Sequence, residues 1–328
     1  MQKRRLGKTG FEVNEIGLGT WQVGGVWGQP FDNQLAERIL DEAIERGVNF
    51  LDTADVYSDG ESEKAVGRAI RKAQGKVLVA TKCGRRIQPH VAENYTPEVL
   101  EQYVDDSLRR LGVETIDLIQ LHCPPTEVYY RPEIFALFER LKAKGKIRNL
   151  GVSVEKVEEA MKAVEYDNVT TVQIIFNMVR HRPSDRFFAL AREKDVGILV
   201  RVPLASGLLT GKFSSQTAFG PEDHRTFNRH GAAFDKGETF AGIDYETGLK
   251  VVDKLKAVFP AQPNLAAWAL RWILMHPEVS LVIPGASRPE QVVSNLEASA
   301  LRPLTPAEMT AVREIYSSDV RAMVHHLW

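Results

Sequence analysis

Short apolar runs alternate along this chain with longer stretches of helical periodicity. Most of the runs are continuously apolar, rich in β-branched residues, and too short to be helices. This pattern is typical of strands covered on both faces. Eight such runs follow Glu15, namely Ile16–Gly19, Val48–Leu51, Val77–Thr81, Ile116–Leu121, Ile147–Val152, Val172–Phe176, Ile198–Val202 and Leu281–Ile283.

The segments between these runs carry helix signals. Apolar residues share one face over 33–46 before Gly47, and again over 65–73 before Gly75. Thr96-Pro97 predicts an N-cap followed by the first helical residue, with a helix running to Gly112. Thr305-Pro306-Ala307-Glu308 matches a capping box, which predicts a late helix.

Strand–helix alternation predicts an α/β fold, and eight repeats over about 300 residues favour a closed (β/α)8 TIM barrel. Arg4–Glu15, centred on Gly7-Lys8-Thr9-Gly10, predicts a small β-hairpin that caps the N-terminal end. The segment Ser214–Thr247 lacks apolar periodicity and predicts a long functional or disordered loop after the seventh strand. No linker is apparent, so we expect a single domain over residues 1–328.

The composition of the chain limits the binding partners and the cell compartment that we expect. The net charge is −1, which gives no general attraction to nucleic acid or to anionic membranes. Cys83 and Cys123 are too few for a disulfide framework and indicate a reducing compartment. The basic N-terminus has no apolar run after it, and no stretch approaches the roughly 18 apolar residues of a membrane span. We therefore expect a soluble, cytoplasmic protein.

Polar residues stand out at the C-terminal ends of three successive predicted strands. Asp52 and, five residues later, Tyr57 follow the second run, Lys82 ends the third and His122 ends the fourth. In a parallel barrel these ends open at one mouth. The sequence thus predicts a carboxylate, a phenol, an amine and an imidazole in one place.

These four groups suit proton transfer to a carbonyl oxygen. Asp52 would keep Lys82 charged, and the lysine cation would lower the pKa of Tyr57 from its usual value of about 10. Such a tyrosine is a general acid, and His122 would donate a hydrogen bond to the carbonyl oxygen. Each residue alone is more often structural, but four complementary groups favour a catalytic role. A metal-dependent hydrolase is the alternative; one histidine beside a lysine and a tyrosine makes a poor ligand set, so we expect no metal.

Ordered motifs over nearly the whole chain resemble the aldo-keto reductase family, in its bacterial branch rather than the aldose-reductase branch. The most specific of them is Asp52-Thr53-Ala54-Asp55-Val56-Tyr57. The others are Gly17-Leu18-Gly19-Thr20-Trp21, Thr81-Lys82, Asp117–His122, Gly151-Val152-Ser153, Val172-Gln173, Pro203–Lys212 and Ile283–Arg288.

The resemblance implies an NAD(P)H-dependent reductase of aldehydes or ketones that works by direct hydride transfer. Tyr57 would be the acid, Asp52 and Lys82 its tuning groups, and His122 the group that orients the carbonyl. Trp21, Tyr57 and His122 would line the substrate pocket, with Trp27 and Trp328 as further candidates. The family also contains nucleotide-sensing interaction proteins with little turnover, which is the alternative function.

The resemblance also implies a set of cofactor contacts. Asp52 belongs to it, as do Gly19, Thr20 and Trp21 at the mouth and Ser153 and Gln173 at the carboxamide. The pyrophosphate would lie along Pro203, Leu204, Ser206, Gly207, Leu209, Gly211 and Lys212. The adenosine end would meet Gly285, Ser287, Arg288, Gln291 and Asn295. No G-x-G-x-x-G fingerprint is present, which fits a nucleotide bound on a barrel.

Three positions depart from the family pattern. Val154 stands where an asparagine often helps to hold the carboxamide, and Arg201 stands where an aromatic side chain usually stacks on the nicotinamide. A guanidinium can also lie against a ring, and its charge would disfavour the oxidised cofactor. Gly285 replaces a frequent lysine near the 2′-phosphate, so selectivity rests on Ser287 and Arg288. NADP(H) is favoured, and NAD(H) stays open.

Other residues carry weaker expectations. Cys83 and Cys123 are expected to be packing residues. His224, Arg225, Arg229 and His230 of the long loop either close over the cofactor or are solvated, and Tyr129 and Tyr130 follow His122 in the next loop. The sequence leaves open the substrate and whether the protein is a monomer or a homo-oligomer.

Overall fold

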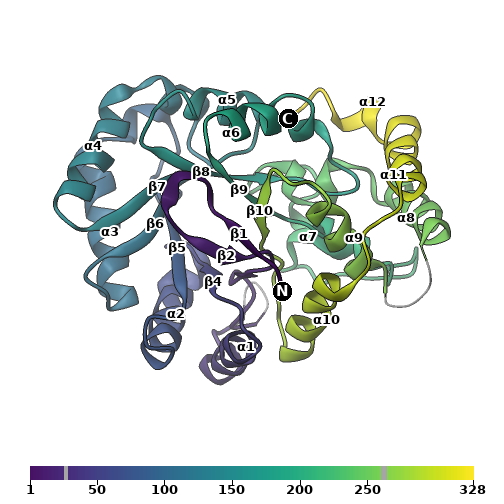
Figure 1. Ribbon diagram of the computed structural model, residues 1–328, viewed down its shortest axis with the longest axis horizontal. Coiled ribbons are helices and arrows are strands. Elements are labelled where there is room, and N and C mark those ends of the chain that lie inside the picture. Colours follow the sequence, from purple (N-terminus) through teal and green to yellow (C-terminus); the bar gives the residue numbers. More distant parts are fainter. Residues whose placement is uncertain (26–28, 260–263) are drawn as a thin grey trace.

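The computed structural model describes residues 1–25, 29–259 and 264–328. In this part of the chain, eight parallel strands form one sheet that is surrounded by helices (Figure 1). All eight predicted strands are confirmed, with boundaries shifted by a few residues. They are β3 (Leu18–Gly19), β4 (Phe50–Asp52), β5 (Leu78–Cys83), β6 (Ile116–His122), β7 (Ile147–Ser153), β8 (Val169–Ile175), β9 (Gly197–Arg201) and β10 (Val279–Val282).

The sheet closes on itself between its first and last strands. The neighbours run in sequence order from β3 to β10, and Gly17 N donates to Val282 O at 2.9 Å across the gap. Gly19 N donates to Pro284 O at 3.0 Å. A Cβ atom on Gly19 would lie 3.0 Å from the carbonyl oxygen of Ile283, so this close approach requires glycine. The predicted (β/α)8 barrel is confirmed.

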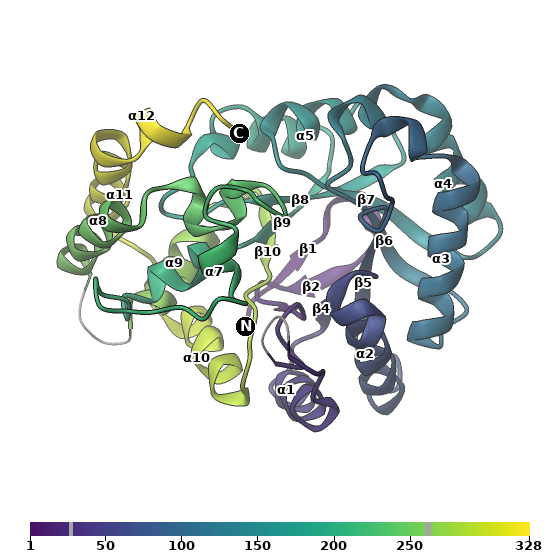
Figure 2. The same ribbon diagram turned by 180° about the vertical axis from the view of Figure 1, so that it is seen from behind.

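Helices cover the outside of the barrel (Figure 2). They are α1 (Asn33–Glu45), α2 (Glu61–Lys72), α3 (Pro97–Leu111), α4 (Pro132–Ala143), α5 (Val157–Ala163), α6 (Phe187–Glu193), α7 (His224–Phe227), α8 (Tyr245–Val258), α9 (Leu265–Leu274), α10 (Pro289–Ala300), α11 (Pro306–Asp319) and α12 (Arg321–Val324). The predicted caps are present: Thr96 accepts from Val99 N, and Thr305 and Glu308 form a capping box. Within the described ranges, no helix combines the length and the apolar character that crossing a bilayer requires.

The strands are buried on both faces, which explains their continuous apolar character. Their outward residues join the helices in one large hydrophobic cluster. Their inward residues form a second, smaller cluster that fills the barrel, made of Leu6, Val13, Phe50, Ala80, Leu118, Leu199, Leu281 and Ile283.

Leu6 and Val13 of this inner cluster come from the predicted hairpin. β1 (Lys3–Arg5) pairs antiparallel with β2 (Glu12–Asn14), and the pair lies across one opening of the barrel (Figure 1). Lys8 N donates to Asp195 O at 2.7 Å, which fixes the turn to the strand entrance before β9. The hairpin cap is therefore confirmed.

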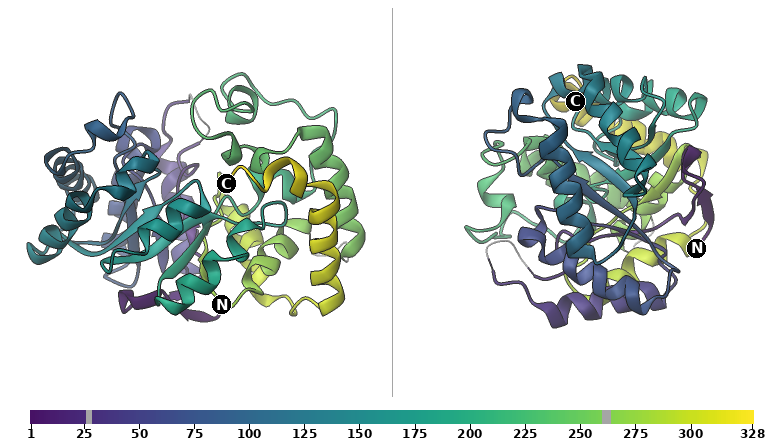
Figure 3. Two further views of the ribbon diagram at one scale, coloured as in Figure 1. Left: turned by 90° about the horizontal axis from the view of Figure 1, so that it is seen from above. Right: turned by 90° about the vertical axis from the view of Figure 1, so that its left-hand side faces the viewer.

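The long segment between β9 and α8 lies at the end of the barrel opposite the hairpin (Figure 3). It contains only short helical turns besides α7, at Ala205–Thr210, Lys236–Glu238 and Phe240–Gly242. Its own side chains fold it, since the buried Asn228 accepts hydrogen bonds from Ala233 N at 2.9 Å and Phe234 N at 3.0 Å. The predicted long loop after the seventh barrel strand is confirmed, and it is a folded loop.

Candidate active site

The ends of β4, β5 and β6 bring the four predicted polar groups together. Lys82 Nζ is buried and donates to Asp52 Oδ2 at 2.6 Å, to the Thr53 carbonyl at 2.8 Å and to the Tyr57 hydroxyl at 3.2 Å. The ring of His122 meets the ring of Tyr57 edge to face, with 6.0 Å between centroids. These strands are neighbours in the sheet, so consecutive strand ends place complementary groups within contact distance.

Burial and neighbouring charges together set the protonation states in this cluster. Burial alone would lower the pKa of Lys82, but Asp52 and Tyr57 outweigh it and raise that pKa above 10.5. Burial raises the pKa of Tyr57 above 10.0, and the opposing effect of Lys82 does not cancel it. The expectation of a net lowered tyrosine pKa is therefore wrong. Tyr57 is protonated at neutral pH, as a proton donor must be.

His122 is held neutral. Burial, followed by the positive charges of Lys82, Arg85 and Arg201, lowers its pKa well below 6.5. Its Nδ1 atom is buried and has no hydrogen-bond partner among the described residues. A neutral imidazole next to the Tyr57 ring can donate one N–H to an oxygen placed between them.

Asp52 is fixed by more than the lysine. Its Oδ1 atom accepts from Gln173 Nε2 at 2.8 Å and from Gln120 Nε2 at 3.1 Å. Ser153 Oγ donates to Gln173 Oε1 at 3.5 Å, so the two residues predicted at the carboxamide lie beside the cluster of Asp52, Tyr57, Lys82 and His122. Sequence reasoning missed Gln120; its signal is a polar residue two positions before His122, between the apolar residues Ile119 and Leu121 of β6.

Arg201 ends β9 at the same mouth. Its Nη2 atom donates to the Val154 carbonyl at 3.0 Å, and Nη1 pairs with Glu238 Oε1 at 3.2 Å. Its Nε atom is buried without a partner among the described residues. Burial would lower the pKa of Arg201, but Glu238 and its other neighbours outweigh that effect and raise it, so the guanidinium stays charged.

The first predicted cofactor segment is Gly19, Thr20 and Trp21, and part of it is already engaged in hydrogen bonds and ring contacts within the protein. Thr20 is buried, and its hydroxyl donates to the Asp52 carbonyl at 3.0 Å and lies 2.8 Å from Ser62 Oγ. The Trp21 ring contacts His224 and Phe234 of the long loop, at centroid distances of 4.9 Å and 6.2 Å. The long loop therefore reaches the mouth.

The structure describes one of the two other candidate tryptophans, Trp328. Trp27 lies outside the described residues. Trp328 is buried against the Arg180 guanidinium, whose central carbon lies 4.3 Å from the ring centroid. It lies against Gly237 and Gly242 of the long loop, and its place in a substrate pocket stays a prediction.

The pyrophosphate candidates form a turn held by the long loop. Ser206 Oγ donates to the Glu238 carbonyl at 2.8 Å and accepts from Phe240 N at 3.2 Å. Gly207 and Gly211 have φ of 90° and 71°, values that favour glycine. Pro203 and Leu209 are buried, Leu204 is half-buried, and Lys212 is exposed.

The adenosine candidates lie beside the barrel closure. Gly285 forms a β-bridge with Gly19, so the predicted adenosine segment adjoins the predicted cofactor segment at Gly19. Ser287 donates to Gln291 Oε1 through its N–H at 2.7 Å and its hydroxyl at 3.1 Å, and Asn295 Nδ2 donates to Gly285 O at 3.2 Å. The Arg288 side chain is 61% exposed at the start of α10, which leaves it available to a ligand.

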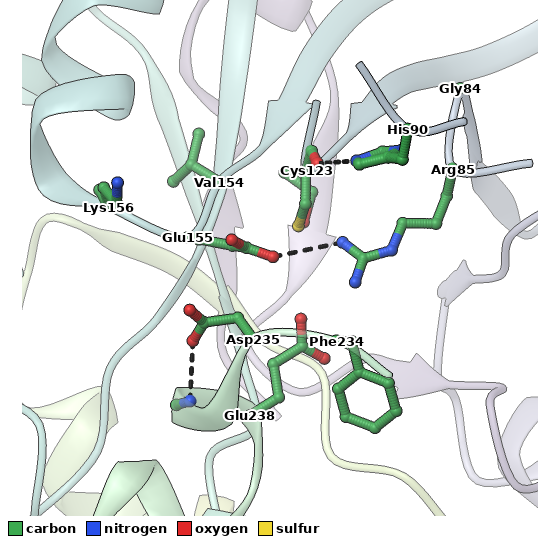
Figure 4. Close-up of polar contacts among 12 residues, drawn as sticks. Gly84, Arg85, His90, Cys123, Val154, Glu155, Lys156, Phe234, Asp235 and Glu238 are labelled. Carbon is green, nitrogen blue, oxygen red and sulfur yellow. Dashed lines mark hydrogen bonds and ion pairs between the residues drawn. The ribbon is translucent and has the colours of Figure 1, made fainter. Parts of the chain in front are cut away.

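Charged residues that sequence reasoning missed surround the mouth (Figure 4). Arg85 comes three residues after Lys82, and Glu155 comes two residues after Ser153. Arg85 Nη1 donates to Glu155 Oε1 at 3.2 Å. Glu238 comes from the long loop. Arg85 and Glu155 follow strand ends directly, which is the signal that could have found them, whereas Glu238 carries no such signal.

Both cysteines are buried, free thiols, as expected for packing residues. Cys123 Sγ lies 3.6 Å from Ser153 Oγ, and burial raises the pKa of this thiol to about 11. Burial likewise raises the pKa of Cys83 well above 9.0. Cys123 adopts φ of 45° directly after His122, a left-handed conformation that turns the chain away from the strand.

Comparisons with known proteins agree with this architecture. The sequence pattern of the aldo/keto reductase family matches residues 15–317. An uncharacterized oxidoreductase of Bacillus subtilis is 31% identical over 98% of both chains. The NADH-specific methylglyoxal reductase of Escherichia coli is 30% identical over 96% of this chain and 98% of its own. The solved glycerol dehydrogenase of Gluconobacter oxydans is 30% identical with a TM-score of 0.77, over 97% of this chain and 96% of that one.

Family pattern, curated relatives and solved fold all span nearly the whole chain, and the eight-stranded barrel with its polar strand ends agrees with them. The chain belongs to the aldo/keto reductase family.

Proposed function

We propose that this protein reduces aldehydes or ketones to alcohols with a nicotinamide dinucleotide, and that Tyr57 is the general acid. One observation carries the proposal: Lys82 Nζ is buried within hydrogen-bond distance of both Asp52 and the Tyr57 hydroxyl. The name of the Escherichia coli relative, a methylglyoxal reductase, supports carbonyl reduction as the reaction.

The residues present fit a nicotinamide. Ser153 and Gln173 offer hydroxyl and amide groups beside Asp52, and His122 Nδ1 and Arg201 Nε are buried donors or acceptors without partners in the described structure. Bound there, the reduced cofactor supplies a hydride to the carbonyl carbon. We favour NADP(H) because the family resemblance assigns Ser287 and the exposed Arg288 to the 2′-phosphate, and NAD(H) stays open because the Escherichia coli relative is named NADH-specific.

The protein's own groups handle the oxygen. His122 and the Tyr57 hydroxyl would hold the substrate oxygen between them, which polarises the carbonyl. As hydride reaches the carbon, the phenolic proton passes to the oxygen and completes the alcohol. The charged Lys82 stabilises the phenolate that remains, and Asp52 keeps the lysine charged and in place. A proton from solvent then restores the phenol.

Replacing the acid tests the proposal. In Tyr57→Phe the ring stays but the proton is lost, so turnover should fall at least a hundredfold, the usual contribution of a positioned acid. Nucleotide binding should persist because the nucleotide contacts lie elsewhere. The measurements are the loss of reduced-nicotinamide absorbance over a panel of carbonyl compounds and nucleotide titration by fluorescence.

The outcomes separate the alternatives. Turnover by Tyr57→Phe at the wild-type rate would remove this tyrosine from the mechanism. A wild-type protein that binds nucleotide but reduces no carbonyl compound would favour the sensing role over the enzymatic one. Activity lost to a chelator would instead indicate a metal-dependent reaction.

A further inference from the structure

We propose that Glu155, Glu238 and Arg85 select carbonyl substrates that carry hydroxyl groups beside the reacting carbonyl. The inference rests on the proposed function and names the substrate class of the same site. Arg85 pairs with Glu155 and Arg201 pairs with Glu238, and both carboxylates lie by Cys123, the residue after His122.

The charged groups converge on one point (Figure 4). A carboxylate oxygen of Glu155, one of Glu238 and the Cys123 sulfur all lie within 4.8 Å of one another. Glu155 follows β7 and Glu238 belongs to the long loop, so the cluster joins the barrel to the loop that covers it. Arg85 approaches from the side of β5 and pairs with Glu155 at 3.2 Å.

Arg85, Glu155 and Arg201 lie at the C-terminal ends of β5, β7 and β9, which is the end of the barrel that also carries Lys82 and His122. The side chains of Arg85, Glu155 and Glu238 keep exposures of 20%, 24% and 20%, so they reach solvent while being mostly enclosed. Their charges act on the catalytic residues: Arg85 and Arg201 lower the pKa of His122, and Glu238 contributes to raising that of Tyr57. A substrate held by His122 and Tyr57 would thus meet these side chains with its remaining atoms.

The chemistry of the cluster favours a neutral, hydroxylated ligand. Arg85, Arg180 and Arg201 lie among Glu155, Asp235 and Glu238, so the positive and negative charges balance and a charged substrate gains no net attraction. Carboxylate oxygens accept hydroxyl protons, and guanidinium N–H groups donate to hydroxyl oxygens, so a hydroxyl group can use both.

Two other ligand classes fit less well. A divalent cation could use Cys123, Glu155 and Glu238, but it would have to displace a guanidinium from each carboxylate. A carboxylate-bearing substrate would bring a third negative charge to acidic groups that already repel each other. Burial, with the charges of Asp235 and Glu238, raises the pKa of Glu155 to about 7.

The test compares two aldehydes with the same carbon chain, propanal and glyceraldehyde, with concentrations corrected for hydration. A hydrogen bond to a charged group corresponds to roughly tenfold or more in binding. The wild-type kcat/KM for glyceraldehyde should therefore exceed that for propanal at least about tenfold. Glu238→Gln and Glu155→Gln should each reduce this ratio by about tenfold, mainly through KM.

Glu222→Gln is the matched control, because Glu222 lies exposed on the same long loop. Its ratio should equal that of the wild type. A general loosening of the loop in Glu238→Gln would change both substrates alike and leave the ratio intact, so a structural effect is distinguishable from loss of recognition. Melting temperatures of all variants check that they fold.

Three results would overturn the inference while the proposed function stands: a wild-type ratio near one, a ratio that survives both substitutions, or a wild-type preference for the anionic aldehyde glyoxylate. Failure to reduce any of these aldehydes with either nucleotide would instead count against the proposed function itself.

Discussion

Asp55 lies in the same motif as Asp52 and Tyr57 but has a different environment. Both of its carboxylate oxygens are buried without a hydrogen-bond partner in the described structure. Burial, followed by the charge of Glu63, raises its pKa from 3.8 to about 7. A carboxyl group whose pKa is higher in the folded chain stabilises it fully below pH 4, and this stabilisation is lost as the pH rises through 7.

Asp55→Asn should therefore stabilise the protein selectively at alkaline pH. A shift of this size corresponds to a penalty on the order of 4 kcal/mol above pH 7. The melting temperature of Asp55→Asn should exceed that of the wild type at pH 8, with no gain at pH 4. Asp167→Asn, an exposed aspartate, is the control and should show no such difference. A gain that does not depend on pH would contradict the assigned charge state.

For single residues, the sequence predicts which side chains come together better than it predicts their pKa values. Asp52, Lys82 and His122 could be placed together because each lies at a strand end, and strand ends in a parallel barrel share one mouth. The direction of the Tyr57 pKa shift could not, because it depends on how completely the phenol is buried. Glu238 could not be found either, since only the fold brings a loop residue to Arg201.

Among the elements, the hairpin shows how one glycine can fix a cap to a barrel. Gly7 has φ of 51°, and a Cβ atom there would overlap the backbone of Gly197 at the start of β9. Gly10, in the same turn, has φ of 81° and open space around it. Both glycines thus have a left-handed backbone conformation, but only Gly7 lies against the barrel.

Gly7→Ala should destabilise the protein more than Gly10→Ala. Left-handed backbone costs an alanine about 1 kcal/mol at either position. Overlap with β9 should add roughly 1–3 kcal/mol at Gly7 alone. The free energy of unfolding in urea measures both variants, and equal losses would show that the turn can move away from the barrel at little cost.

Helices and strands could be predicted because their apolar residues recur with a regular period. The long loop could be predicted only as a stretch where that period is missing. All eight strands have apolar runs, and the helices have capping residues such as Thr96 and Thr305. The loop's short turns depend on side-chain contacts like those of Asn228, which no period in the sequence encodes.

For the molecule as a whole, barrel closure brings together segments that lie far apart in the sequence. The bridge between Gly19 and Gly285 puts the proposed nicotinamide and adenosine segments side by side. A dinucleotide extended over the mouth would contact both. The single domain over residues 1–328 stays a prediction.

Arg288→Ala should weaken NADPH binding more than NADH binding. Losing a charge-assisted contact to a phosphate corresponds to roughly tenfold or more in Kd, and NADH lacks the 2′-phosphate. Fluorescence titration of both nucleotides measures the difference. Arg313→Ala, an exposed arginine on α11, is the control. Equal weakening of both nucleotides would place Arg288 on the adenine ring and remove the main reason to favour NADP(H).

The burial of the two thiols bears on the durability of such an enzyme. Aldehydes are electrophiles, and the thiolate rather than the thiol is the form of cysteine that attacks them. Cys123, one residue from His122, and Cys83, one residue from Lys82, both hold their protons at neutral pH. In the proposed reaction the two sulfur atoms beside His122 and Lys82 would thus meet an aldehyde in their inert form, which would protect the protein from covalent self-inactivation over many turnovers.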